Sequence, residues 1–110
     1  MKPLQISEAA SQEVAEAVRW YEERRPGWGV RLFDAVSDVF ELIEQRPEIG
    51  SPRKSRPATR QLVVRGFPYV VAYRIRSDDV YVVALAHGKR RPVTGTPEPG
   101  PSGRTIGSPL

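Results

Sequence analysis

Apolar residues in the first quarter of the chain recur at helical spacing. Between residues 8 and 25 they fall every three or four positions, at Ala10, Val14, Ala17, Val18 and Tyr21. This period predicts an amphipathic helix with one buried face. Ser7 is well suited to cap its N-terminus, and Pro26-Gly27 is a strong stop signal.

A second apolar stripe follows almost at once. It consists of Val30, Phe33, Val36, Phe40 and Ile43, and Arg46-Pro47 ends it. Acidic residues fall mostly off the stripe, as expected for a helix with one solvated face. Because the connection at residues 26–27 is so short, the two predicted helices form an antiparallel hairpin.

The pattern changes after a proline-rich and basic loop, which is predicted over residues 47–60. Three β-rich runs follow, at residues 62–64, 69–73 and 80–85. Turn-forming residues separate them, so neighbouring strands are expected to be antiparallel and to form a meander. A further short strand is predicted at residues 3–6. The fold class is therefore α+β: a short N-terminal strand, then an antiparallel helical hairpin packed on one face of an antiparallel β-meander, with the other face partly open.

The end of the chain has a different composition. Residues 93–110 are dominated by Pro, Gly, Ser and Thr, which predicts a disordered tail behind a single domain at residues 1–92. The sequence has no cysteine, so disulfide and thiol chemistry are excluded. It also has neither an apolar run long enough to span a membrane nor a signal-peptide pattern, and the expected location is the cytoplasm.

Charge divides the chain into two halves. Residues 1–50 carry six Lys or Arg and ten Asp or Glu, whereas residues 51–110 carry eleven and three; the balances of −4 and +8 give the net charge of +4. Such a division indicates either one surface built for an anionic partner or a solvated acidic face beside a basic sheet. Charge alone does not separate these two interpretations.

The order of motifs resembles a known family. The first helix ends in W-Y-E-E-R-R-P-G-W-G (residues 20–29), and the second contains R-L-F-D-A-V (31–36). Arg60 opens a strand, F-P-Y-V-V-A-Y-R spans residues 67–74, and A-H-G-K-R-R-P spans residues 86–92. Together these segments resemble the RelE/ParE superfamily of type II toxin–antitoxin toxins over residues 3–92.

This resemblance implies one of two activities. RelE-like members cut mRNA on the ribosome without a metal, which needs a base, an acid and cations around the scissile phosphate. Arg60, Arg65, Arg74 and His87 are the candidates for those roles. However, no Tyr follows His87 and the F-P-Y strand lacks a basic run. Both features resemble the ParE-like branch, whose members poison DNA gyrase.

The predicted function is thus the ParE-like toxin of a type II module, which binds a cognate antitoxin in a hetero-oligomer and inhibits DNA gyrase. The alternatives are a RelE-like endonuclease acting on ribosome-bound mRNA and an inactive relative that binds only antitoxin. The antitoxin's type and the oligomeric state stay open.

Several residues are singled out as binding candidates. They are Trp28, Arg65, Arg74, Lys89, Arg90 and Arg91, which are expected to contact antitoxin or target. Tyr69 and Tyr73 share one strand face and are expected in the core. No metal site or cofactor is predicted, and the helical acids are expected to be solvated charge: Glu13, Glu16, Glu22, Glu23, Asp34, Asp38, Glu41 and Glu44.

Overall fold

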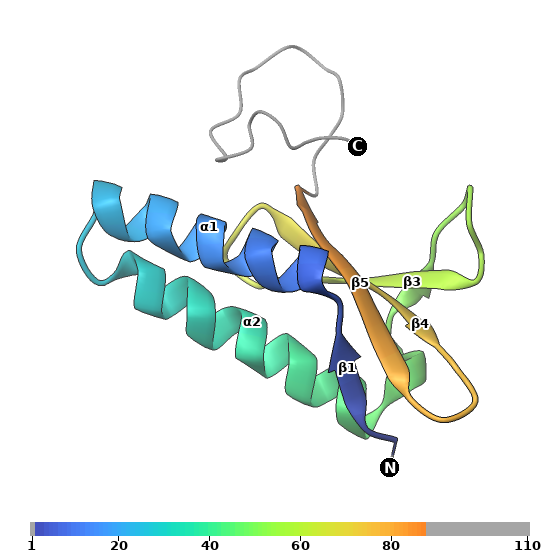
Figure 1. Ribbon diagram of the computed structural model, residues 1–110. Helices are drawn as coiled ribbons and strands as arrows, with labels where there is room; N and C mark the ends of the chain where they lie inside the picture. The colour runs from blue at the N-terminus through green and yellow to red at the C-terminus, as the bar shows by residue number, and fades with distance from the viewer. Residues whose placement is uncertain (1, 88–110) are drawn as a thin grey trace.

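Two helices pack on one face of a five-stranded sheet in the computed structural model, which describes residues 2–87 (Figure 1). The elements in order are β1 (Leu4–Ile6), α1 (Glu8–Arg24), α2 (Trp28–Gln45), the 3₁₀ turn η1 (Pro47–Ile49), β2 (Ser51–Pro52), β3 (Thr59–Val63), β4 (Tyr69–Ile75) and β5 (Val80–His87). The predicted α+β fold, with its N-terminal strand and helical hairpin, is confirmed. The predicted tail at residues 93–110 lies outside the described residues.

The strand order in the sheet is β1-β5-β4-β3-β2. The run β3-β4-β5 is the predicted antiparallel meander. β1 lies parallel to β5, with Leu4 opposite Val80 and Ile6 opposite Val82. Parallel pairing needs a long crossover between the two strands, and the helical hairpin together with β2–β4 supplies it.

Two details of the predicted loop at residues 47–60 were wrong. β3 begins at Thr59, one residue before the Arg60 that the motifs placed at the start of a strand and three before the predicted β-rich run from Leu62. β2, within the predicted loop, pairs with it at Ser51↔Gln61 and Pro52↔Arg60. The backbone N–H of Arg53 also donates to the carbonyl of Thr59 at 2.9 Å. These polar residues are strand residues because a neighbouring strand satisfies their backbone groups, which alternation of side chains does not reveal.

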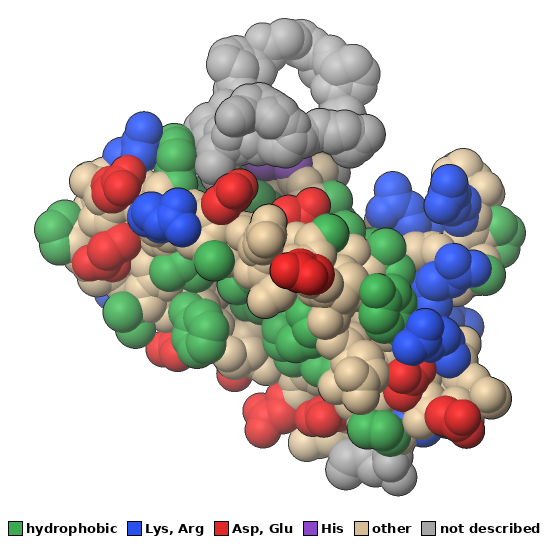
Figure 2. All heavy atoms as spheres, in the orientation of Figure 1, with side chains coloured by type: hydrophobic (Ala, Val, Ile, Leu, Met, Phe, Trp, Pro, Cys, Tyr) green, Lys and Arg blue, Asp and Glu red, His purple; other side chains and the backbone are tan. Residues whose placement is uncertain are grey.

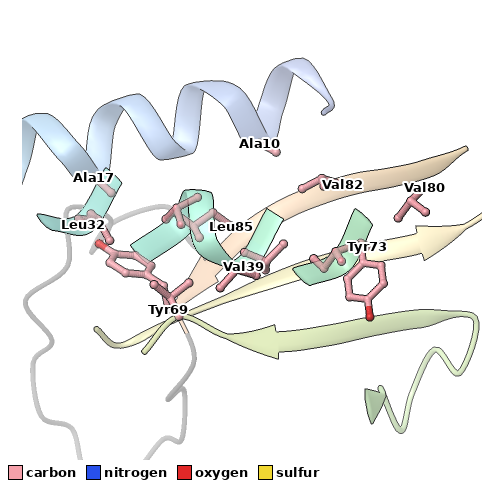
Figure 3. Close-up of a cluster of buried hydrophobic side chains, with 13 residues drawn as sticks. Ala10, Ala17, Leu32, Val39, Tyr69, Tyr73, Val80, Val82 and Leu85 are labelled. Carbon is pink, nitrogen blue, oxygen red and sulfur yellow. The ribbon is translucent and has the colours of Figure 1, made fainter. Parts of the chain in front are cut away.

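The core lies between the helices and the sheet (Figure 3). Tyr69 and Tyr73 are buried there, as predicted. The predicted apolar stripe of the second helix was only partly right: Val36 and Ile43 are buried, but Val30 and Phe33 are 60% and 53% exposed. The residues that α2 buries are Gly29, Leu32, Val36, Val39 and Ile43. The predicted stripe and the observed buried face share Val36 and Ile43, so helical spacing alone does not determine which of the two faces is buried.

The first helix starts as its sequence predicts. The Ser7 hydroxyl accepts a hydrogen bond from the N–H of Ala10 at 3.0 Å, and Glu8 lies in the first turn. The Ser7 hydroxyl also donates to the carbonyl of Val83 at 3.0 Å, which ties the start of α1 to β5. Neither helix in residues 2–87 combines the length and apolarity needed to cross a membrane.

Candidate functional site

The tip of the helical hairpin is held by Glu22. Gly27, the N-cap residue of α2, takes a left-handed conformation with φ of 93°. As a glycine, it has no side chain that could cap the helix. The Glu22 carboxylate accepts hydrogen bonds from the N–H groups of Gly27, at 3.0 Å, and Gly29, at 2.9 Å. An anion at a helix N-terminus is favourable. Glu22 is exposed, as predicted, but it also has the structural role of capping α2, which the sequence analysis did not predict.

Gly29 lets the two helices approach closely. A Cβ at this position would lie 2.7 Å from the carbonyl oxygen of Val18 and 2.8 Å from Cβ of Glu22. The W-Y-E-E-R-R-P-G-W-G segment thus forms the tight turn between the two helices, which Glu22, Gly27 and Gly29 stabilise together. This arrangement sets the position of Trp28, which lies between the two glycines.

Trp28 joins the hairpin tip to the turn between β3 and β4. Its ring packs edge-on against Phe67, with centroids 6.0 Å apart, and Tyr21 contacts the same Phe67 ring at 5.3 Å. The guanidinium groups of Arg25 and Arg31 lie 5.0 and 5.1 Å from the centre of the Trp28 ring. Trp28 is half-buried, whereas Arg25 and Arg31 are exposed, so the two cations are the accessible part of this cluster.

A groove of about 920 Å³ runs from this cluster between α2 and β3. We call it the α2–β3 groove; its lining is Trp28, Arg31, Asp34, Ala35, Asp38, Val39, Leu42, Leu62, Val63, Arg65, Gly66 and Phe67. Two of the predicted binding residues, Trp28 and Arg65, meet here. Leu42 and Val63 in the same groove are 38% and 63% exposed. A concave apolar surface with cations at one end is suited to binding a protein segment.

A second groove lies on the other side of α2. We call it the α1–α2 groove; its volume is about 790 Å³, and Ile6, Val14, Val18, Phe33 and Phe40 form its apolar floor. Arg19, Glu22 and Glu23 stand along it. Phe33 of α2 and Ile6 of β1 are exposed in this groove, so these apolar residues are not part of the core.

Arg60, a predicted phosphate-binding cation, is occupied by the backbone. Its Nη1 donates to the carbonyl of Gly50 at 2.6 Å and to that of Glu48 at 3.2 Å. Beside it, the Tyr73 hydroxyl donates to the carbonyl of Pro47 at 2.7 Å and accepts from the N–H of Gly50 at 2.8 Å. Burial raises the pKa of Tyr73. The two side chains together anchor the η1 turn to the sheet.

The four ribonuclease candidates do not converge in the structure. Arg74 lies at the Thr59 end of the sheet, opposite Tyr81, while His87 pairs with Tyr69 at the opposite end. Arg74 and Tyr69 are five positions apart on β4, which is about 16 Å at 3.3 Å per residue. Arg65 lies in the β3–β4 turn.

His87 lies against the core aromatic residues. Its ring is 5.5 Å from that of Tyr69, edge to face, and the two residues form a cross-strand pair. Burial raises the pKa of the Tyr69 phenol. Lys89, Arg90 and Arg91 were predicted to bind a partner, and they lie outside the described residues.

Comparison with known proteins identifies the family. Residues 4–92 match the sequence profile of the ParE toxin of the type II toxin–antitoxin system, parDE. The chain belongs to the ParE toxin family. It is 29% identical over 90 residues to Toxin ParE2 of Mycobacterium tuberculosis, in strains CDC 1551 and H37Rv, covering 81% of this chain and 84% of that protein. The resemblance drawn from the motifs is thereby confirmed.

The fold agrees with a solved structure of the same kind. The chromosomal ParDE toxin–antitoxin system from P. aeruginosa superposes with a TM-score of 0.72 at 14% identity, covering 81% of this chain and 98% of that one. Within the ParE fold, helix spacing and the W-Y-E-E motif predicted the hairpin and its aromatic tip. They did not predict Leu42 and Val63 as groove residues, because an exposed apolar side chain has no distinct sequence signal.

Proposed function

We propose that this ParE-family chain is the toxin of a type II toxin–antitoxin module in the cytoplasm, neutralised by a cognate antitoxin, and that it inhibits DNA gyrase. It acts by binding and not through catalytic chemistry of its own. Family membership supports the module, and the arrangement of the sheet supports the mode of action.

The observation that carries this proposal is the composition of the sheet face turned away from the helices. Cross-strand pairs place Val70 opposite Ala86 and Ala72 opposite Ala84 on this face. Metal-free cleavage of RNA requires a base, an acid and several cations within hydrogen-bond reach of one phosphate. Small apolar side chains supply none of these. Arg60 and Arg74 lie close together at one end of the sheet, whereas His87 lies at the other end, too far away to act on the same phosphate.

The basic half of the chain supports an acidic antitoxin. Residues 51–77 contain seven cations (Arg53, Lys54, Arg56, Arg60, Arg65, Arg74 and Arg76) and no acid. Lys and Arg side chains gather over one end of the molecule, while acidic residues are spread over the helices (Figure 2). A field of one sign accelerates association with a partner of the opposite sign. Trp28, Arg65, Arg74 and the cations at residues 89–91 are the proposed contacts with antitoxin or target.

Three assays on the purified chain separate this proposal from its alternatives. With gyrase and supercoiled plasmid, we expect trapped, cleaved DNA, and addition of the antitoxin encoded by the adjacent open reading frame should prevent it. Cleavage of mRNA on translating ribosomes, lost in His87→Ala, would instead establish a RelE-like endonuclease. Antitoxin binding without growth arrest on expression would establish an inactive relative.

A further inference from the structure

Four cations gather at the end of the sheet that carries Thr59. Arg74 of β4 is the cross-strand partner of Thr59. On the other side, the N–H of Arg53 donates to the carbonyl of Thr59 at 2.9 Å, and the N–H of Thr59 donates to the carbonyl of Arg56 at 2.8 Å. These two bonds hold the β2–β3 loop, which also carries Lys54, beside the end of β3. We call Arg53, Lys54, Arg56 and Arg74 the basic patch.

The basic patch includes part of the sheet face that is turned away from the helices. Residues directly opposite each other in an antiparallel pair have side chains on the same face. One row across the sheet therefore consists of Arg53, Thr59, Arg74 and Tyr81. Arg53 and Arg74 are two strands apart, which is about 10 Å. The β2–β3 loop stands out beyond the sheet (Figure 1), and Lys and Arg side chains gather on that side of the molecule (Figure 2).

The charges of the basic patch are not used to hold the fold together. Lys54, Arg56 and Arg74 are exposed, and Arg53 is partly exposed. In the part of the chain that the structure describes, none of the four forms an ion pair with a carboxylate. Four accessible positive charges on one surface attract a partner that carries several negative charges.

The surroundings of the basic patch favour a nucleic acid over an acidic protein. The centre of a protein–protein interface is built from apolar and aromatic side chains. The other residues of the loop are Ser55, Pro57 and Ala58, and none of the large apolar side chains that are exposed within residues 2–87 belongs to it. Contacts with phosphate need only Lys, Arg, hydroxyl and backbone N–H groups.

The same face favours a double strand over a single strand. Proteins that bind single strands stack the bases on accessible aromatic rings. Tyr81 is the aromatic residue of the row, and the guanidinium of Arg76 already covers it, 4.2 Å from the ring centre. Arg76 is in turn fixed by Asp79 through two hydrogen bonds of 2.7 and 2.8 Å. The phosphate backbone of a duplex requires no such ring.

We propose that the basic patch binds the phosphate backbone of double-stranded DNA, irrespective of base sequence. The guanidinium groups donate pairs of hydrogen bonds to phosphate oxygens, and the Lys54 ammonium adds a point charge. The choice of DNA over RNA rests on the proposed function, in which the target is an enzyme that holds DNA. The inference gives the chain a DNA contact of its own, which needs neither gyrase nor antitoxin.

The test is binding of the purified full chain to a fluorescein-labelled duplex of about 20 base pairs, measured by fluorescence anisotropy. We expect a Kd on the order of 10 μM at 50 mM NaCl. Four phosphate contacts predict that affinity falls about tenfold between 50 and 100 mM NaCl. A duplex of unrelated sequence should bind equally well. A Kd above about 1 mM at 50 mM NaCl would overturn the proposal.

Three variants of equal net charge locate the contact. Arg56→Gln and Arg74→Gln should each weaken duplex binding about tenfold at 50 mM NaCl and make the salt dependence less steep by one phosphate contact. Arg19→Gln removes the same charge from α1 and should bind within about twofold of the parent chain. Circular dichroism verifies that each variant keeps the fold. Equal weakening in all three variants would show that only net charge matters, which would overturn the proposal.

Competing ligands identify the partner. Polyglutamate that displaces the duplex at an equal concentration of charge would assign the basic patch to an acidic protein. Single-stranded RNA of the same length, bound more tightly than the duplex, would assign it to RNA. Either result would overturn the proposal.

The gyrase assay separates this inference from the proposed function. If the chain traps cleaved DNA on gyrase and the free chain binds no duplex, only the DNA contact fails. If the free chain binds duplex through Arg56 and Arg74 and gyrase is unaffected, the DNA contact stands and gyrase inhibition fails.

Discussion

Single residues in this protein hold backbone groups that no secondary structure satisfies. Tyr73 and Arg60 bind the carbonyl and amide groups of the η1 turn, and Glu22 binds the start of α2. Glu13 does the same on β5, where its carboxylate accepts from the N–H of Leu85 at 2.9 Å. Glu13 is thus not simply solvated charge, as was predicted. Polar side chains that look unremarkable in the sequence are structural because buried backbone groups must find partners.

Replacement of Tyr73 by Phe tests the anchor of the η1 turn. The variant leaves the N–H of Gly50 and the carbonyl of Pro47 without their partner, which should lower the free energy of unfolding by about 1–3 kcal/mol. Urea denaturation followed by circular dichroism measures this loss. Tyr81→Phe, whose hydroxyl is not part of this network, should change stability much less; equal losses in both variants would contradict the prediction.

Glu13 predicts a pH dependence of stability. Burial raises its pKa above the ordinary value of 4.5, with a contribution from Glu16 and an opposing one from the Leu85 hydrogen bond. The folded state therefore binds the proton more tightly than the unfolded state, so this group's stabilising contribution is complete below about pH 4.5 and is lost as pH rises through the folded-state pKa.

Glu13→Gln keeps an acceptor for Leu85 and removes the charge. We expect it to raise the Tm relative to the parent at pH 7 and to have little effect at pH 4, measured by thermal melts at both values. Glu41→Gln, an exposed carboxylate on α2, is the control. A Glu13→Gln effect that is larger at pH 4 than at pH 7 would show the sign to be wrong.

At the level of elements, the helical hairpin is the best-defined unit. Its short turn depends on Gly27 in a left-handed conformation, on the Glu22 cap and on the close contact at Gly29. The hairpin then places Trp28 against Phe67, so the tip of the helices and the β3–β4 turn form one surface.

Glu22→Ala should destabilise the hairpin by about 0.5–2 kcal/mol, because the N–H groups of Gly27 and Gly29 lose their acceptor. Chemical denaturation gives the value, and Trp fluorescence reports whether Trp28 loosens. Glu23→Ala is the matched control, since the one ion pair of Glu23 within residues 2–87 is an exposed 3.8 Å contact with Arg24. No difference between the two variants would exclude a capping role for Glu22.

At the level of the whole molecule, the division of charge follows the division into a helical layer and a sheet. The acidic half forms the helical layer, and the basic half forms β2–β5 and their loops. The two grooves lie on opposite sides of α2, so two partners have separate apolar surfaces available. This separation allows antitoxin and target to be tested independently by mutation of one groove at a time.

The charge division predicts salt-dependent assembly with the antitoxin. The association rate should fall about tenfold or more between 50 and 500 mM NaCl, while the dissociation rate changes little, because screening acts mainly on long-range attraction. Stopped-flow fluorescence measures both rates. Arg65→Glu should slow association more than Arg56→Glu, which lies in an exposed loop away from the grooves; the reverse order would argue against a contact at the α2–β3 groove.

The sequence by itself determined the order and type of β1, α1, α2, β3, β4 and β5, the Ser7 cap, the hairpin turn and the family, but it did not reveal η1 or β2. These features depend on local spacing and on residues close together in the chain. Tertiary structure alone decided that Leu32 and Val39, not Val30 and Phe33, face the core, and that Arg60 binds the η1 turn. It also decided that β2 covers only part of β3. The physical reason is that each of these three features depends on which distant segment of the chain packs against the residue. The neighbouring residues in the sequence do not specify that segment.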